Sequence, residues 1–365
     1  MKQRMFCTAV AVMIVLRAAV MLPINIVFTG CCMLCVAAVL LAVFCKKHIN
    51  IKDYVFVLLA CSVALCAYEV NFKINVEPAM QLSGVRAEIV GTVVEEPKQK
   101  DGYKVFLVKT ESIDKKGAVQ KVKLRICANA QEDIKPFDKI SASVDFSDVS
   151  ENYKSSNYAN GIYIGSTADD FMRVSSPDKP PVYAKIIELR QYVRNTLKTN
   201  IGDRYSGVIC GLILGDIDGI SDNDYLNFRE IGVMHLFSVS GLHLIVVCSV
   251  FMAFLRKIRI GKRFSALITL GVVFLVMSIT GFSPSVMRSS ITYIIMLLGI
   301  IFMRLPGNIN SLGVAILVIL IIKPYYILNL AFIMSCVSIM GIIFLSSPIN
   351  SFFMRFAPDI AIVRG

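Results

Sequence analysis

INIVFTGCCMLCVAAVLLAVF, the stretch from Ile24 to Phe44, contains no charged residue. A helix needs roughly 20 apolar residues to cross the hydrocarbon core of a bilayer, so this stretch is long enough to span a membrane. Similar runs lie elsewhere in the chain, which is 56% hydrophobic with a mean hydropathy of +0.66. Soluble globular domains are less apolar, so the sequence predicts a polytopic α-helical membrane protein.

The apolar runs fall into two groups, one near each end of the chain. The candidate spans are Met5–Leu22, Ile24–Phe44, Asp53–Val70, Ile231–Leu255, Phe264–Thr280, Pro284–Met303, Ser311–Ile322 and Ile327–Leu345. Gly207–Gly215 is too short to span, so it is expected to be re-entrant or packed. Val182–Asn200 is expected to be an amphipathic helix that lies on the membrane interface or, equally, a solvated connecting helix.

Basic residues at the ends of particular runs predict the orientation of the chain. The net charge is +12, but Met80–Pro181 carries as many acidic as basic residues, so the excess lies beside the apolar runs. Lys2 and Arg4, the lysines of residues 46–52 and the mostly basic stretch Arg256–Arg263 are typical of cytoplasmic segments. The third run then leads outward, so the region that follows it is expected to be extracytoplasmic.

Residues 80–176 have a different pattern, in which apolar and polar residues alternate in short segments divided by turn residues. Strands are expected at Val85–Val94, Tyr103–Thr110, Val119–Cys127, Lys139–Asp145 and Gly161–Gly165. Strands this short in roughly 100 residues suit a small Greek-key barrel such as an OB-fold, and a β-sandwich is the alternative. The chain should therefore comprise N-terminal transmembrane helices in 1–75, an inserted OB-like β domain in 80–176 and a second transmembrane domain in 182–365.

A candidate DNA-binding face lies within the β domain, where basic residues outnumber acidic ones from Lys98 to Arg125. Alternation places Lys121, Lys123 and Arg125 on the face of a strand opposite to its apolar residues. DNA could bind there, with Tyr103 and Phe106 of the neighbouring strand stacking on bases. The alternative is a solvated outer face with buried aromatic side chains.

A second candidate site lies in the apolar segment MHLFSVSGLHL, residues 234–244. His235, Ser240 and His243 are costly at membrane depth, where polar groups by default mark a pathway or site. Gly241 weakens the helix at this point, as in the broken helices of transporters. The alternative is that each polar group only forms a hydrogen bond with a neighbouring helix.

Arg288 is a further candidate, because it lies one turn inside an apolar span after the turn TGFSP. A charge at this position needs a partner or water, or its side chain must extend to the interface.

Catalytic and metal sites find less support in the sequence. Ser240 and His243 are spaced as neighbours on a helix, but no G-x-S-x-G pattern accompanies them, so an intramembrane hydrolase is the weaker hypothesis. The acidic residues between 216 and 224 lack the bidentate Glu of an EF-hand loop and are better explained by a helix N-cap at Ser221 or Asp222. Most cysteines lie in apolar runs, where they behave as small hydrophobes. We therefore expect no metal and no cofactor.

Several of these segments resemble the ComEC family of competence proteins. From Gly211 onward, GLILGD leads to FREIGVMHLFSVSGLHLIVV, which is similar to the family's signature of a His followed by Ser-Gly-x-His. TGFSPSVMRSS is similar to its Gly-x-Ser-x-Ser-x-x-Arg segment, and VGTVVEEP and IKPFDKISASV are similar to its OB-like domain. NINSLGVAILVILIIKPYYILNLAFIMSCVSIMGIIFL resembles a later helix pair. The family's Gly-Phe-Gln-Leu-Ser pattern there is matched only by Phe332 and Ser335.

The resemblance implies a channel component for uptake of single-stranded DNA across the bacterial cytoplasmic membrane during natural transformation. Its partners would be single-stranded DNA, the lipid bilayer, and other competence proteins or a separately encoded C-terminal half. The family's metallo-β-lactamase-like domain, with its His-x-His-x-Asp cluster, has no counterpart in these 365 residues, so we expect a fragment, a split gene product or a shortened relative that is not a nuclease. A transporter or permease for another solute is the main alternative, ahead of the hydrolase.

The orientation can be tested with a reporter that is active only in the cytoplasm. Fused at Asn152, within the β domain, it should give no signal, because the asymmetry of basic residues places this domain outside. The same reporter fused at Gly261, within the basic stretch, should be active. A strong signal at Asn152 would contradict this topology.

Overall fold

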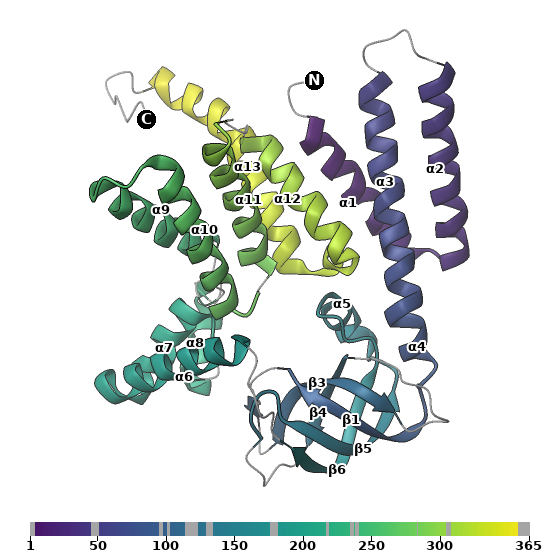
Figure 1. The fold of residues 1–365 in the computed structure, drawn as a ribbon, viewed down its shortest axis with the longest axis vertical. Helices are drawn as coiled ribbons and strands as arrows, with labels where there is room; N and C mark the ends of the chain where they lie inside the picture. The colour runs from purple at the N-terminus through teal and green to yellow at the C-terminus, as the bar shows by residue number, and fades with distance from the viewer. Residues whose placement is uncertain are drawn as a thin grey trace.

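The structure is a computed structural model with a helical part and a curled β-sheet at one end (Figure 1). It describes residues 4–44, 51–94, 98–100, 103–113, 123–128, 134–175, 182–216, 219–233, 237, 241–282, 284–303 and 308–356.

The N-terminal helices follow the first three apolar runs. They are α1 (Arg4–Met21), α2 (Ile24–Phe44) and α3 (Ile51–Asn71). Pro23 lies between α1 and α2, where it cannot continue the first helix. The helix α3 runs on through a π-helical turn, η1 (Phe72–Val76), into α4 (Glu77–Met80), which leads to the sheet (Figure 1).

The second group of helices starts after the sheet. Its members are α6 (Val182–Ile201), α7 (Asp203–Leu214), α8 (Asp222–Glu230), α9 (Gly241–Lys257), α10 (Lys262–Ile279), α11 (Pro284–Ile301), α12 (Asn308–Ile322), the 3-10 turn η3 (Pro324–Leu328) and α13 (Leu330–Phe356). The expected span Ile231–Leu255 is corrected, because Ile231 and Gly232 form a turn after α8, and α9 is described from Gly241 onward. Gly232 has a left-handed backbone (φ 75°) just after α8, which ends that helix.

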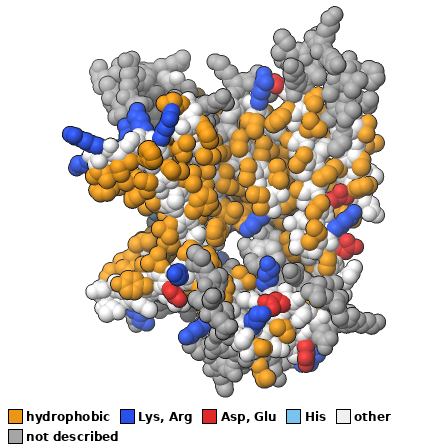
Figure 2. Space-filling view, viewed as in Figure 1, with side chains coloured by type: hydrophobic (Ala, Val, Ile, Leu, Met, Phe, Trp, Pro, Cys, Tyr) orange, Lys and Arg blue, Asp and Glu red, His pale blue; other side chains and the backbone are white. Residues whose placement is uncertain are grey.

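The helical part is consistent with a membrane protein. Within the described residues, Arg4–Met21, Asp53–Met80 and Lys262–Ile279 are long and apolar enough to cross a bilayer, and shorter apolar helices accompany them. Figure 2 shows apolar side chains over much of this part, with a group of Lys and Arg side chains at its upper left edge, where the α9–α10 loop lies. This loop and the start of α1 lie away from the sheet (Figure 1).

The sheet has six strands and curls back on itself. They are β1 (Arg86–Val93), β2 (Lys98–Lys100), β3 (Tyr103–Ile113), β4 (Lys123–Ala128), β5 (Lys139–Ser147) and β6 (Gly165–Ser175). The order is β1-β5-β6-β4-β3-β2, and β1 pairs with β3 as well as with β5. All pairs are antiparallel except β4 with β6, which meet in parallel at Cys127 and Thr167.

Gly91 allows the sheet to bend. The pairing of β1 with β3 shifts register between Val90 and Gly91. A Cβ atom on Gly91 would lie 2.5 Å from the Cγ1 atom of Val108 and 2.9 Å from the carbonyl oxygen of Lys109. Only glycine allows β3 to approach this closely, as is typical at bulges.

One expected strand is wrong and two elements were not expected. Gly161–Gly165 forms no strand, and β6 begins at its last residue and continues to Ser175. Ile162 and Ile164 are both buried although they lie in a loop. The alternation of apolar and polar residues that suggested a strand therefore comes from two buried loop residues. The missed elements are β2 and a polar helix, α5 (Glu151–Ala159).

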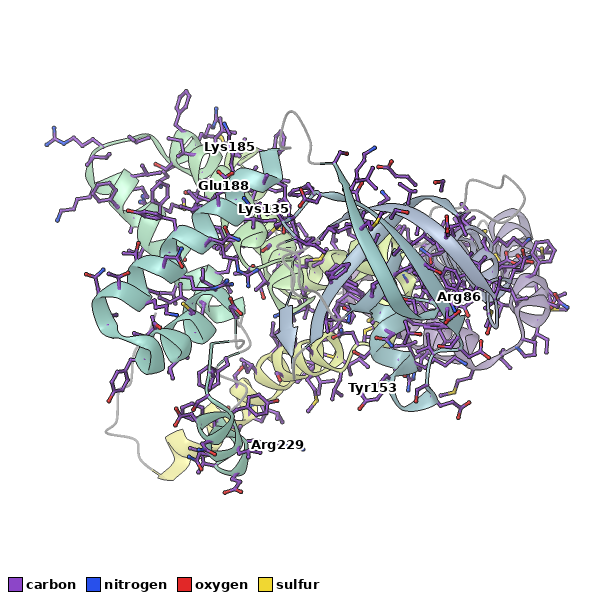
Figure 3. All side chains as sticks on the ribbon, turned by 90° about the horizontal axis from the view of Figure 1, so that it is seen from below. Arg86, Lys135, Tyr153, Lys185, Glu188 and Arg229 are labelled. Atoms are coloured by element: carbon purple, nitrogen blue, oxygen red, sulfur yellow. The ribbon has the colours of Figure 1, made fainter. Side chains whose placement is uncertain are left out.

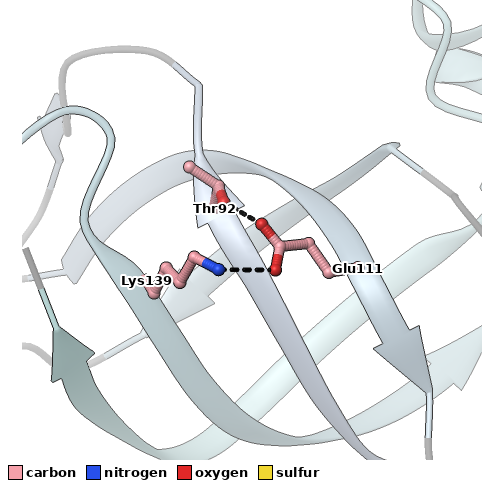
Figure 4. A network of polar contacts seen from close by, with 3 residues as sticks. All are labelled: Thr92, Glu111 and Lys139. Atoms are coloured by element: carbon pink, nitrogen blue, oxygen red, sulfur yellow. Dashed lines mark hydrogen bonds and ion pairs between the residues drawn. The ribbon is translucent and has the colours of Figure 1, made fainter. Parts of the chain in front are cut away.

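The inside of the curled sheet is apolar, and its outer face carries a polar network. Buried side chains include Ile89, Phe106, Val108, Leu124, Ile126, Ile140 and Val144. Outside, Glu111 of β3 accepts hydrogen bonds from the Thr92 hydroxyl of β1 at 2.8 Å and from the Lys139 ammonium of β5 at 2.9 Å (Figure 4). The network crosses three neighbouring strands, but its exposure limits what it adds to stability.

Four tyrosines join the sheet to both groups of helices, and we call them the tyrosine junction. They are Tyr68 of α3, Tyr158 of α5, Tyr163 of the segment just before β6, and Tyr325 of η3. The Tyr325 ring lies 5.3 Å from Tyr68, 5.5 Å from Tyr158 and 5.6 Å from Tyr163, measured between centroids. The Tyr163 hydroxyl donates a hydrogen bond to Asn71 Oδ1 at 3.2 Å. Burial raises the pKa of the Tyr163 phenol to about 12, so it remains a neutral donor at physiological pH.

The first helix packs against a helix near the other end of the chain. A Cβ atom on Gly313 of α12 would lie 2.6 Å from backbone atoms of Met5 and Phe6 in α1. Backbone atoms cannot rotate away as a side chain can, so the contact requires glycine at this position.

We predict that Gly313→Ala destabilises the protein although alanine favours helices. The added methyl group should push α1 from α12 and lower the free energy of unfolding by about 1–3 kcal/mol relative to the control. The control is Gly271→Ala in α10, where a Cβ atom would meet nothing within 4 Å. Thermal unfolding in detergent measures both variants, and equal midpoints would contradict this packing.

Candidate functional site

Arg288 lies buried near the start of α11, with 4% of its surface exposed. Its Nε atom donates a hydrogen bond to Ser335 Oγ of α13 at 2.9 Å, and its Nη2 atom donates to Ser289 Oγ at 2.9 Å. The guanidinium therefore turns into the protein and does not extend along the surface to the interface.

Gly241, the first residue of α9, packs directly on this pair. A Cβ atom at Gly241 would lie 1.7 Å from Ser289 Oγ and 3.4 Å from Arg288 Nη2. Any larger residue would displace the serine or the guanidinium. Three segments that are far apart in the sequence thus meet at one point, and we call Gly241, Arg288, Ser289 and Ser335 the arginine site.

The electrostatics of the arginine site are unusual because, among the described residues, the guanidinium donates its hydrogen bonds to the hydroxyl groups of Ser289 and Ser335, with the thiol of Cys336 also nearby. In the described part of the chain no carboxylate pairs with Arg288. The next residue but one, Ser290, is fully buried, and its Oγ atom has no hydrogen-bond partner among the described residues. A buried cation is stable only if its donors are satisfied or an anion approaches it. Counted over the described residues, the site therefore has a net positive charge, and the Ser290 hydroxyl offers spare hydrogen-bonding capacity.

The arginine site lies toward one end of the helices. Gly241, Arg288 and Ser335 all fall within the first two turns of α9, α11 and α13. The remaining length of α9 leads away to the basic loop, about 25 Å at helical rise. The site is therefore nearer to the sheet end of these helices than to their middle.

The structure brings together only some of the residues that the sequence analysis selected. Gly241 and Arg288 are in contact, whereas His243 lies in the first turn of α9 with an exposed side chain. His235 and Ser240 fall outside the described residues. Ser289 and Ser335 were missed as site residues, although the serines beside Arg288 and the partial motif at Ser335 were visible signals.

The candidate DNA face of the sheet is described only in part. Lys121 and the side chains of Lys123, Arg125 and Tyr103 lie outside the described residues. Leu124 and Ile126 of the same strand are fully buried, as the alternation predicts. Phe106 is corrected, because it is only 2% exposed and lies in the core of the sheet, where no base can reach it.

The GLILGD segment forms the end of α7 and a tight turn. Asp216 is 3% exposed and pairs with the Arg194 guanidinium of α6. The N-cap expected after it is confirmed, since Ser221 Oγ accepts a hydrogen bond from the backbone N–H of Asp224 at 3.2 Å. No group of side chains suited to a metal ion occurs among the residues that the structure describes.

Comparison with known proteins identifies the second helical part. Residues 212–364 match the model of the family described as Competence protein. The chain carries a competence-protein domain. This match includes every residue of the arginine site and confirms the resemblance to the ComEC family.

A curated relative agrees with this assignment. The chain is 22% identical over 151 residues to ComE operon protein 3 of Bacillus subtilis (strain 168), a match that covers 41% of this chain and 20% of the relative. The matched segment thus spans about a fifth of that protein's length. No solved structure matches the chain significantly.

We predict that Gly241→Ala destabilises the helical part and that a second change restores it. The added methyl group collides with the Ser289 side chain, so the single variant should lose about 1–3 kcal/mol of stability. Ser289→Gly removes both atoms that the methyl group would meet, so Gly241→Ala with Ser289→Gly should recover most of the loss. Thermal unfolding in detergent would refute the contact if the second change gave no recovery.

Proposed function

We propose that this chain is a channel component for uptake of single-stranded DNA across the bacterial cytoplasmic membrane, and that the arginine site contacts the passing strand. The observation that carries the proposal is the meeting of three motif segments of the competence domain around one buried guanidinium. A buried charge among apolar helices is costly, so the convergence of residues from α9, α11 and α13 on Arg288 indicates a functional role for this charge.

The chemistry of the arginine site suits a phosphodiester. Arg288 retains a positive charge under all physiological conditions, and guanidinium groups form strong charge-assisted hydrogen bonds with phosphate oxygens. Its present partners are neutral hydroxyls, which can exchange for a passing anion without leaving a buried carboxylate unpaired. Because phosphates repeat along a strand, one fixed cation could contact them in turn without reading the sequence.

The proposal includes the orientation of the chain and the form of its β domain. The basic α9–α10 loop and the start of α1 lie away from the sheet (Figure 1), and basic loops remain in the cytoplasm, so we place the sheet outside. The pairing of β1 with both β3 and β5 supports an OB-like barrel, a fold that commonly binds single strands. We further propose that the chain does not hydrolyse DNA, which rests on the lack of a His-x-His-x-Asp cluster in its sequence.

A permease for another anionic solute is the second candidate, because a buried cation that donates to the neutral hydroxyls of Ser289 and Ser335 would suit many anions. The competence-domain match favours DNA. Competition decides between the two: a DNA channel should take up labelled single strands, and small anions in excess should not block it.

The test is the uptake of labelled DNA into the nuclease-protected interior of cells. In the native host, Arg288→Gln should reduce uptake at least tenfold with unchanged protein level in the membrane, because the amide keeps hydrogen bonds but loses the charge. Arg288→Lys should retain part of the activity. The matched control is Arg229→Gln on α8, an exposed arginine whose loss should leave uptake unchanged (Figure 3). Normal uptake in Arg288→Gln would overturn the proposal.

A further inference from the structure

A row of three aromatic rings links the sheet to the competence domain. Phe137 lies in the turn before β5, Tyr183 in the first turn of α6, and Phe282 in the turn between α10 and α11. The Phe137 and Tyr183 centroids are 6.3 Å apart with the rings perpendicular at 89°. Tyr183 and Phe282 are also 6.3 Å apart, at only 33°. We call these residues the aromatic row.

Both phenylalanines of the aromatic row have a backbone conformation that L-residues rarely adopt. Phe137 has φ 70° and Phe282 has φ 55°, which is the left-handed region that favours glycine. Backbone hydrogen bonds hold both, from Phe137 to the Val93 carbonyl at 2.8 Å and from Phe282 to the Met277 carbonyl at 3.0 Å. Strain that the surrounding structure maintains in this way is concentrated at functional sites.

Basic side chains accompany the row. Lys135 and Lys185 are exposed and lie at the boundary between the sheet and α6, with Glu188 nearby (Figure 3). Arg190 of α6 reaches the α10–α11 turn, where its Nη1 atom lies 4.0 Å from the Cβ position of Gly281, next to Phe282. Its Nε atom is buried and has no hydrogen-bond partner within the described ranges.

We propose that the aromatic row and the basic side chains of Lys135, Lys185 and Arg190 form a binding site for single-stranded DNA. This site would receive the DNA strand before the arginine site does. This inference rests on the proposed function and names the residues that first hold the substrate. Aromatic rings interleaved with cations are the general means of binding a single strand without reading its sequence.

The geometry suits stacking. A base between two rings needs about 6.8 Å, twice the 3.4 Å spacing along a strand. The rings of Tyr183 and Phe282, which are tilted by 33°, would have to align and separate slightly from their 6.3 Å to admit a base. Phe282 lies in the turn just before α11, the helix whose first turns hold Arg288. The competing explanation is that the row only packs α6 against its neighbours.

The chain contains no tryptophan, so Tyr183→Trp introduces a single fluorescent reporter into the row. In the purified full chain, an oligodeoxythymidine should quench its fluorescence saturably, and added salt should weaken the binding. Tyr153→Trp, at an exposed position of α5, is the matched control and should not be quenched (Figure 3). An unquenched Tyr183→Trp variant would overturn the inference.

A second pair of variants separates binding from folding. Phe137→Asn and Phe282→Asn remove a ring while supplying a residue that tolerates the left-handed backbone, so thermal stability should hardly change. Each should weaken oligodeoxythymidine binding about tenfold, as expected for the loss of one stacked base. Unchanged affinity in both variants would return the row to a packing role.

Uptake by cells shows which idea has failed. If these variants take up DNA normally while Arg288→Gln does not, only the aromatic row is wrong. If Arg288→Gln also takes up DNA normally, the proposed function is wrong and the inference that rests on it is wrong as well.

Discussion

A positive charge placed among apolar helices constrains everything around it. The Arg288 guanidinium needs hydrogen-bond acceptors that the hydrocarbon region cannot supply, and Ser289 and Ser335 provide them. To bring Ser335 within 2.9 Å, α13 must lie beside α11. To leave room for the serine, α9 must begin with a glycine at position 241. The arrangement of these helices is thus adapted to one side chain, which would be replaced by an apolar residue if stability alone mattered.

The tyrosine junction fixes the position of the sheet relative to the helices. Tyr325 in the turn η3 contacts rings from α3, from α5 and from the chain that enters β6. Each ring combines a large apolar area with a polar tip, which suits a place where lipid-type packing ends and a wetter domain begins. Domains joined only by linkers move freely, whereas this contact involves both groups of helices at once. A DNA strand that passed between the sheet and the helices would therefore encounter two parts whose relative position is fixed.

Sequence patterns predicted the parts of this structure that depend on local composition. The first three apolar runs became α1, α2 and α3 with nearly the expected bounds, because length and hydrophobicity alone decide such helices. Gly161–Gly165 failed because two isoleucines buried from a loop imitate a strand. The sequence could single out Arg288, because a charge within an apolar span is costly, but it could not predict that Ser335 is its hydrogen-bond partner. The contact joins different helices, and helical periodicity contains no information on which helices are neighbours.

The contact between α1 and α12 has a consequence for the order of membrane insertion. Met5 and Phe6 leave the ribosome long before Gly313, so α1 forms while its partner does not yet exist. A helix waiting in lipid must have no unsatisfied polar group. Thr8, which becomes fully buried in the finished protein, meets this condition because its hydroxyl donates to the Arg4 carbonyl of its own helix at 2.8 Å. Thr8 thus needs no hydrogen-bond acceptor from a helix that is made later, whereas Arg4 of the same helix pairs with Asp53 of α3 at 3.0 Å.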